Sequence, residues 1–225
     1  MRSRGSKVWV WSTAVAVLLL LPTPSARAHD MWLEPTSFAA APGDGVGVAL
    51  RLGHPAAEIE SVARDGRRIV RFVVAGPEGE QAVSGVDGTD PAGVVRFEEP
   101  GRYVVAYRST DAVSELPAVK FESYLAEEGL EPVRRLRADR GETGEPGREL
   151  FSRALKALIT VGRPAPGPVD HPLGLRLELV AEGDPAALGR DRRLPVRLLF
   201  EGRPLAGARV DAVSLDRPEL ASIAR

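Results

Sequence analysis

The chain has 225 residues, with 30 lysines and arginines against 31 aspartates and glutamates. This balance offers no basic surface for nucleic acid or for an anionic membrane. Cysteine is absent, which excludes disulfides, thiolate metal sites and thiol chemistry. The length suits one large domain or two small ones, and the 23 glycines and 19 prolines indicate many turns.

Residues 1–28 have the three-part pattern of a secretory signal peptide. A basic segment (Met1–Lys7) is followed by an apolar segment (Val8–Leu21) and by a polar segment (Pro22–Ala28) that ends in small residues. The apolar segment is shorter than the roughly 20 residues that a membrane span needs. We expect cleavage after Ala28, export to the periplasm or cell surface, and no transmembrane segment in the mature chain.

Residues 29–120 have the pattern of short strands separated by turns. Alternating or β-branched runs between glycine and proline turns predict strands over Val46–Leu52, Arg68–Ala75, Val94–Phe97 and Tyr103–Tyr107. Strands at this spacing indicate an antiparallel, immunoglobulin-like β-sandwich.

Residues 121–162 have helical spacing instead. One helix is expected at Phe121, Tyr124, Leu125 and Leu130, and a second where apolar residues recur between Leu150 and Ile159, ended by Gly162. We expect both helices to pack on the sandwich.

Residues 163–172 contain four prolines and indicate a stiff linker. Beyond it, residues 173–225 form a second β unit, in which leucines from Leu173 to Leu179 alternate with other residues. Further strands are expected over Leu194–Phe200 and Val210–Leu215. About three strands are fewer than an independent sheet normally needs, so this second β-sandwich is expected to be incomplete.

Cleavage after Ala28 would make His29 the first residue of the mature protein. Its free amine, with an ordinary pKa near ~8, and its imidazole can chelate one transition metal. His54 follows the strand predicted at Val46–Leu52, so it can lie beside His29 and supply a third nitrogen, a set suited to Cu(II), Ni(II) or Co(II). Asp30 can add its amide nitrogen or its carboxylate. The competing interpretation is a chance first residue and an ordinary loop histidine.

Other residues are expected to have structural roles. His171 lies in the proline linker and is not expected to be a ligand. Trp32 is expected to anchor the first strand in the core, although shielding of a metal site is an alternative. The glycines between Gly43 and Gly47 precede a strand, so they indicate a turn rather than a phosphate-binding loop.

Several segments together resemble the exported family called domain of unknown function 4198. They are His29–Pro35, Lys120–Leu130, Gly147–Glu149 leading into Lys156–Leu158, and Leu194–Gly202 with Pro204–Ala208. The resemblance implies an exported protein, and some relatives accompany nickel or cobalt uptake. In those relatives an N-terminal histidine and a His-Pro pair match His29 and His54-Pro55. The turn at Pro204–Ala208 also resembles transthyretin-like and adhesin-like sandwiches. Relatives continue through further strands, so we expect a truncated second unit here.

These observations predict an exported, non-enzymatic protein that binds a divalent transition metal and serves nickel or cobalt uptake, passing the metal to a membrane permease. Two alternatives stay open. One is a copper-dependent oxidative enzyme, because an N-terminal histidine chelate resembles the copper site of lytic polysaccharide monooxygenases. The other is a cell-surface interaction module without metal.

Overall fold

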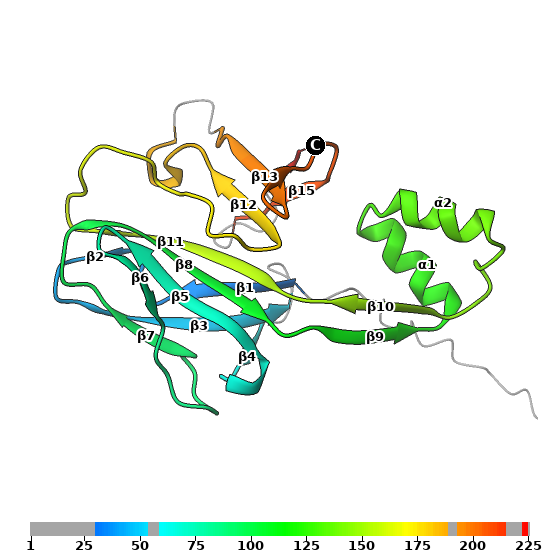
Figure 1. Ribbon diagram of the computed structural model, residues 1–225, viewed down its shortest axis with the longest axis horizontal. Coiled ribbons are helices and arrows are strands. Elements are labelled where there is room, and N and C mark those ends of the chain that lie inside the picture. The colour runs from blue at the N-terminus through cyan, green and yellow to red at the C-terminus, as the bar shows by residue number, and fades with distance from the viewer. Residues whose placement is uncertain (1–29, 54–58, 189–192, 215–221, 225) are drawn as a thin grey trace, which may run out of the picture.

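The computed structural model describes residues 30–53, 59–188, 193–214 and 222–224. These residues form a mainly β protein with several sheets, in which two α-helices are described. Figure 1 shows two sheets that face each other, an arm that carries the helices, and a C-terminal β unit that lies over one of the sheets. In the described part, no helix is both long and apolar enough to cross a membrane.

The first sheet is built around one long strand. β3 (Gly45–Gly53) pairs with β1 (Asp30–Pro35) along one edge, and with β7 (Gly93–Arg96) and β4 (Ile59–Val62) along the other. All of these pairs are antiparallel. β1 therefore lies at the edge of its sheet, and its first residue, Asp30, lies opposite Gly53 at the end of β3.

The second sheet has the order β2-β11-β8-β5-β6. Its strands are β2 (Ala39–Ala40), β11 (Ala154–Val161), β8 (Gly101–Ser109), β5 (Ile69–Gly76) and β6 (Gly79–Ala82). β2 pairs with β11 in parallel, and the other pairs are antiparallel. A short 3-10 helix (Gly66–Arg68) leads into β5, and Asp65 caps it by accepting a hydrogen bond from the amide of Arg67.

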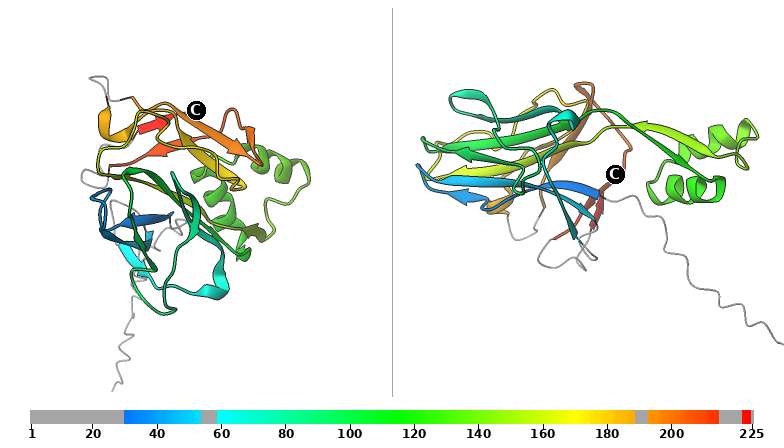
Figure 2. Two further views of the ribbon diagram at one scale, coloured as in Figure 1. Left: turned by 60° about the vertical axis from the view of Figure 1, so that its left-hand side comes forward. Right: turned by 90° about the horizontal axis from the view of Figure 1, so that it is seen from below.

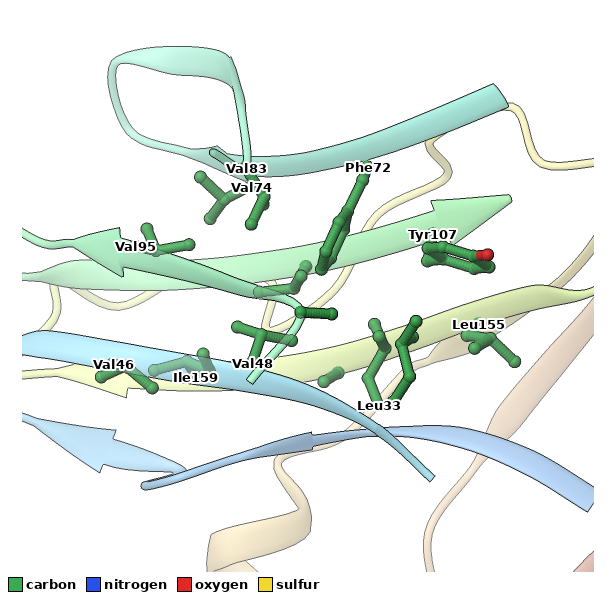
Figure 3. Close-up of a cluster of buried hydrophobic side chains, with 14 of the residues drawn as sticks. Leu33, Val46, Val48, Phe72, Val74, Val83, Val95, Tyr107, Leu155 and Ile159 are labelled. Carbon is green, nitrogen blue, oxygen red and sulfur yellow. The ribbon is translucent and has the colours of Figure 1, made fainter. Parts of the chain in front are cut away.

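The hydrophobic core lies between these two sheets (Figure 3). Valines at 46 and 48 of β3 face Phe72 and Val74 of β5, and β11 contributes four inward-facing residues. Phe72 and Tyr107 meet edge to face with ring centroids 5.5 Å apart. Both sheets contribute alternate residues, which is the pattern of a two-layer β structure.

The strands predicted for the first β unit are confirmed, but the second predicted helix is wrong. Residues 147–161 form β10 (Gly147–Phe151) and β11 instead. In β11, Leu155, Ala157, Ile159 and Val161 are buried in the core, and the residues between them are half-buried on the other face. Because Leu158 is apolar on that second face, the strand also satisfies helical spacing, and the sequence pattern could not separate the two structures.

The arm is a two-stranded ribbon with a helical hairpin at its end. β9 (Ala112–Leu116) pairs with β10, and α1 (Ala118–Glu127) and α2 (Glu131–Asp139) connect them. The predicted helix near Phe121 is confirmed as α1. α2 was not predicted, and α1 lies with it beyond the ribbon, whereas the predicted helix was expected to pack on the sandwich (Figures 1 and 2). Arg137 connects the hairpin by bonding Glu122 at 2.8 Å and by lying 4.9 Å from the centre of the Phe121 ring.

The C-terminal unit lies over the outer face of the second sheet, where Leu175 packs against Val73 and Ala106. It contains the sheet β12 (Leu177–Ala181), β13 (Val196–Phe200) and β14 (Arg203–Pro204), and the pair β15 (Val210–Ala212) and β16 (Ser222–Ala224). A 3-10 helix (Pro185–Ala187) lies between β12 and β13. The strands predicted over Leu194–Phe200 and Val210–Leu215 are confirmed with shorter bounds, the end at Leu215 lying outside the described residues, and the alternating leucines from Leu173 to Leu179 give a strand shifted to Leu177–Ala181.

Candidate functional site

Of the three predicted metal ligands, Asp30 lies among the described residues, and His29 and His54 lie outside them. Asp30 is exposed at the start of β1, and its backbone is opposite Gly53 in the antiparallel ladder. Asp30 follows one histidine in the sequence, and Gly53 precedes the other. The structure therefore places the start of β1 beside the end of β3, and a metal site shared by the two histidines would need these two strand ends to be close.

Negative charge from several elements gathers near the start of β1. The pKa of Glu128, at the end of α1, is raised by partial burial and then by the negative charge of Asp30. Glu127 and Asp211 raise it further, and Arg209 opposes the shift. A carboxylate whose pKa is raised by like charges would be stabilised by an added cation.

Arg209 is the cation that offsets part of this charge. Its guanidinium forms two bonds to Asp211, at 2.8 and 2.7 Å, and donates a third to the carbonyl of Glu127 at 2.6 Å. That carbonyl lies in the last turn of α1, which has no basic residue of its own and where a positive charge is favourable. Arg209 therefore offsets part of the negative charge that acts on Glu128.

Within the part of the chain that the structure describes, no three histidines or carboxylates are grouped closely enough to hold a metal ion. The carboxylates near Asp30 therefore form no ligand set by themselves among the described residues. His171 forms two hydrogen bonds through its backbone. Its amide donates to Asp170 at 2.8 Å, and its carbonyl accepts from Lys156 at 3.1 Å.

Trp32 does not anchor β1 in the core, contrary to expectation. Leu33 and Pro35 are the buried residues of this strand, so strand alternation turns Trp32 to the outer face, where it is half-buried. Its indole nitrogen is enclosed by protein and has no hydrogen-bond partner among the described residues. A buried indole N–H usually has a partner, so this donor is a feature that needs an explanation.

Trp32 lines a cleft of about 540 Å³ between the sandwich and the C-terminal unit. Met31 and the outer residues of β11 line one side. Across from them are apolar residues of the C-terminal unit: Leu177, Leu179, Ala181, Leu194 and Val196. Leu177 and Leu179 are 47% and 41% exposed. The cleft is therefore a largely apolar space, within the size range of small-molecule sites.

A buried ion-pair cluster closes part of this cleft. Lys156 on β11 contacts Asp170 at 2.6 Å and Glu178 at 3.0 Å, and both carboxylates are almost completely buried. Asp170 also accepts from the amides of His171 and Ala181. Each charge in this cluster is neutralised or hydrogen-bonded by a neighbour, which is the condition for burying it.

A loop surrounds the carboxylate of Glu178 and supplies its remaining hydrogen bonds. The amides of Leu173, Gly174 and Leu175 donate to it at 2.6, 2.9 and 3.1 Å. Because Glu178 points inward, Leu177 and Leu179 point to the opposite face of β12.

Sequence reasoning did not identify the cluster of Lys156, Asp170 and Glu178. Lys156 lies in the segment expected to be a helix, and Asp170 lies in the presumed linker. These residues have no motif spacing, so no local signal could have joined them. Asp170, near the end of the proline-rich segment, is buried and bonds both Lys156 of the sandwich and the amide of Ala181 in β12. The segment is therefore held to both parts of the fold.

The family model described as "Domain of unknown function (DUF4198)" matches residues 26–222. The chain belongs to this family. The match includes both β units, the arm and the segment that begins β1. No curated protein and no solved structure matches the chain. Membership in DUF4198 confirms the family resemblance and assigns no chemistry to its residues.

Proposed function

We propose that this DUF4198 protein is exported to the periplasm or cell surface and there binds one divalent transition metal, Ni(II), Co(II) or Cu(II), as an accessory to metal uptake. The ligands are the amine and imidazole of His29 and the imidazole of His54, with Asp30 as a further donor. The metal is cargo that passes to a membrane permease. We also propose that the fold is an immunoglobulin-like sandwich followed by a partial transthyretin-like or adhesin-like sandwich.

The observation that carries the proposal is the register of β1 and β3. Asp30 lies opposite Gly53. The proposal extends this antiparallel register by one residue on each strand, which would make His29 and His54 direct neighbours. Directly opposite residues have Cβ atoms about 4.5–5.5 Å apart and share a face of the sheet. Two imidazoles at that spacing can bind one ion, with metal–nitrogen distances of about 2.0–2.1 Å.

The charge around Asp30 supports the same proposal. Carboxylates of α1 and β15 lie close enough to raise the pKa of Glu128. A divalent cation bound at the start of β1 would lie in this negative potential, which raises its local concentration. Metal binding should also lower the pKa of Glu128, because the added positive charge stabilises the carboxylate.

The test is a calorimetric titration of the exported protein, with its first residue established by mass spectrometry, against Cu(II), Ni(II) and Co(II). An extra residue before His29 displaces the amine and should weaken binding at least tenfold, or about 1.4 kcal/mol. His54→Ala should have an effect of similar size. His171→Ala is the matched control and should bind as the unmodified protein does.

Equal affinity of the extended, His54→Ala and unmodified proteins would refute the site. Binding should also weaken on acidification, because protons compete for the amine and for both imidazoles. Trp32 is the one tryptophan after Ala28, so quenching of its fluorescence by Cu(II) gives an independent measurement near the proposed site. Reductant-dependent turnover with copper would instead favour an oxidative enzyme.

A further inference from the structure

We propose that a pocket at the end of the sandwich from which the arm leaves binds a zwitterionic amino acid whose apolar side chain ends in a hydroxyl group. The pocket has a volume of about 400 Å³, which lies within the size range of small-molecule sites. Its lining comes from the ends of β3 and β8, the start of β9 and the end of β10, and Figure 1 shows β8 continuing into the arm there. The site does not depend on the proposed metal ligands.

The inner wall of the pocket is apolar and comes from the first sheet. Leu50, Leu52 and Val62 line it, and Leu50 lies directly opposite Val62 in the ladder of β3 and β4. Met31 also lines the pocket and lies opposite Leu52, so these two side chains share a face of the sheet. A ligand with an apolar body would be stabilised here, because binding removes both its own surface and that of the wall from water.

Tyr107 contributes a hydroxyl group that forms no hydrogen bond within the described part of the chain. The residue lines the pocket and is 3% exposed, and its ring packs edge to face on Phe72. Figure 3 shows the hydroxyl pointing away from Phe72 and from the valines of the core, in the direction in which β8 runs toward Ser109. Ser109 is another residue of the lining, so the hydroxyl points toward the pocket.

The hydroxyl oxygen of Tyr107 can be reached by a ligand. Among the described residues, the enclosed side-chain atoms without a hydrogen bond belong to Trp32 and to three arginines, so the unbonded oxygen of Tyr107 retains accessible surface. Burial raises the pKa of Tyr107, and the group therefore stays protonated at neutral pH and can donate as well as accept. A hydroxyl group at the end of the ligand side chain matches it.

Two unpaired charges also line the pocket. Among the described residues, neither Asp111 nor Arg153 forms an ion pair, with the other or with a third residue. The remaining charges of the lining are compensated, because Asp65 is bonded by Arg67 at 3.0 Å and lies 3.7 Å from Arg68. The lining therefore offers one carboxylate and one guanidinium to a ligand.

A zwitterion is the ligand that pairs both of these charges at once. The guanidinium of Arg153 lies over the Phe151 ring, 5.3 Å from its centre, and its fork of donors fits a carboxylate. Asp111 can accept from an ammonium group. An anion would leave Asp111 unpaired, a cation would leave Arg153 unpaired, and an uncharged ligand would pair neither. A free amino acid carries both charges on one carbon, together with a side chain for the apolar wall.

The test is calorimetric titration of the exported protein in EDTA with four ligands that share one skeleton. L-Tyrosine has all three polar groups, tyramine lacks the carboxylate, 3-(4-hydroxyphenyl)propanoate lacks the ammonium group, and L-phenylalanine lacks the hydroxyl. We expect tyramine and the propanoate each to bind at least tenfold more weakly than L-tyrosine, because each loses a bond between charged groups. L-Phenylalanine should bind roughly fivefold more weakly, the ratio expected for one neutral hydrogen bond.

Three variants assign each polar group of the ligand to one residue. Arg153→Met should remove the preference for L-tyrosine over tyramine, Asp111→Asn the preference over the propanoate, and Tyr107→Phe the preference over L-phenylalanine. Arg148→Met and Asp139→Asn are the matched controls, because both residues are exposed and neither lines the pocket. These controls should bind L-tyrosine as the unmodified protein does. Circular dichroism checks that each variant is folded, and the four ligands test the unmodified protein even where a variant does not fold.

The proposal is overturned if L-tyrosine does not bind, or if any of the three analogues binds the unmodified protein as tightly as L-tyrosine does. It is also overturned if a folded variant retains the preference that it is expected to lose. Because EDTA removes metal from this experiment, its failure would leave the metal proposal untouched. Failure of the metal titration would likewise leave this pocket untouched.

Discussion

Lys156→Met is the substitution that most directly tests how the C-terminal unit is held to the sandwich. The lysine side chain is 10% exposed, and its partners Asp170 and Glu178 are 3% and 1% exposed. Removing the cation leaves two carboxylates buried without a counter-charge. Breaking a buried pair in this way costs about 3–5 kcal/mol of the free energy of unfolding.

The structure places the expected loss at the lower end of that range. Five backbone amides continue to donate to the two carboxylates: two to Asp170 and three to Glu178. We therefore expect a loss of about 3 kcal/mol. With a urea dependence of about 2 kcal/mol per molar, the unfolding midpoint would fall by about 1.5 M.

Two further variants make this measurement specific. Arg96→Met removes one member of an exposed pair, in which Arg96 and Glu98 are 65% and 69% exposed at 3.3 Å, and should cost less than about 1 kcal/mol. Adding Glu178→Gln to Lys156→Met removes one of the two unpaired charges but turns an NH2 group toward loop amides that donate to the carboxylate, so the double variant should recover little of the loss. If Lys156→Met and Arg96→Met lose the same small amount, the cluster does not hold the two parts together.

Three other predictions follow from the arm and from the C-terminal sheet. Gly147→Ala should destabilise the protein by about 1–3 kcal/mol in urea unfolding, because its Cβ would lie 2.0 Å from the Phe121 ring, whereas Gly144→Ala has open space and should be neutral. Burial and the hydrogen bond to Glu149 raise the pKa of Tyr124 to about 12, so a Tyr124→Phe variant should lose a tyrosinate absorbance step near that pH. Below the unfolded pKa of about 10, Tyr124 is protonated in both the folded and the unfolded protein, so its full contribution to folding stability is present. That contribution is lost as the pH rises through the folded pKa of about 12. A tyrosinate absorbance step of Tyr124 near pH 10 would contradict this prediction. Amide hydrogen exchange should be faster in β15 than in β5 and β8, because β15 pairs with β16 alone in the described part, whereas β5 and β8 each have strand neighbours on both sides; equal rates would refute it.

The sequence by itself determined the strands that are bounded by turn residues and the helix whose apolar residues have helical spacing. Its turn residues and alternating runs predicted the strands that became β3, β5, β7 and β8, and its helical spacing predicted α1. Gly43, with φ of 89°, is one of the turn glycines that separate these strands. These strands were predictable because β-branched runs between turn residues indicate a strand even where both faces are buried, as they are in β3, β5 and β8.

Only the tertiary structure decided whether residues 154–161 form a strand or a helix, and which side chains of β12 turn inward. β11 has the core on one face and the C-terminal unit on the other, so Leu158 interrupts the alternation and gives the strand helical spacing. Glu178 could turn inward because Lys156 and three loop amides meet its carboxylate there, and that arrangement moved two leucines into the cleft. Each outcome depends on a partner distant in sequence, and a local pattern carries no information about a partner that folding supplies.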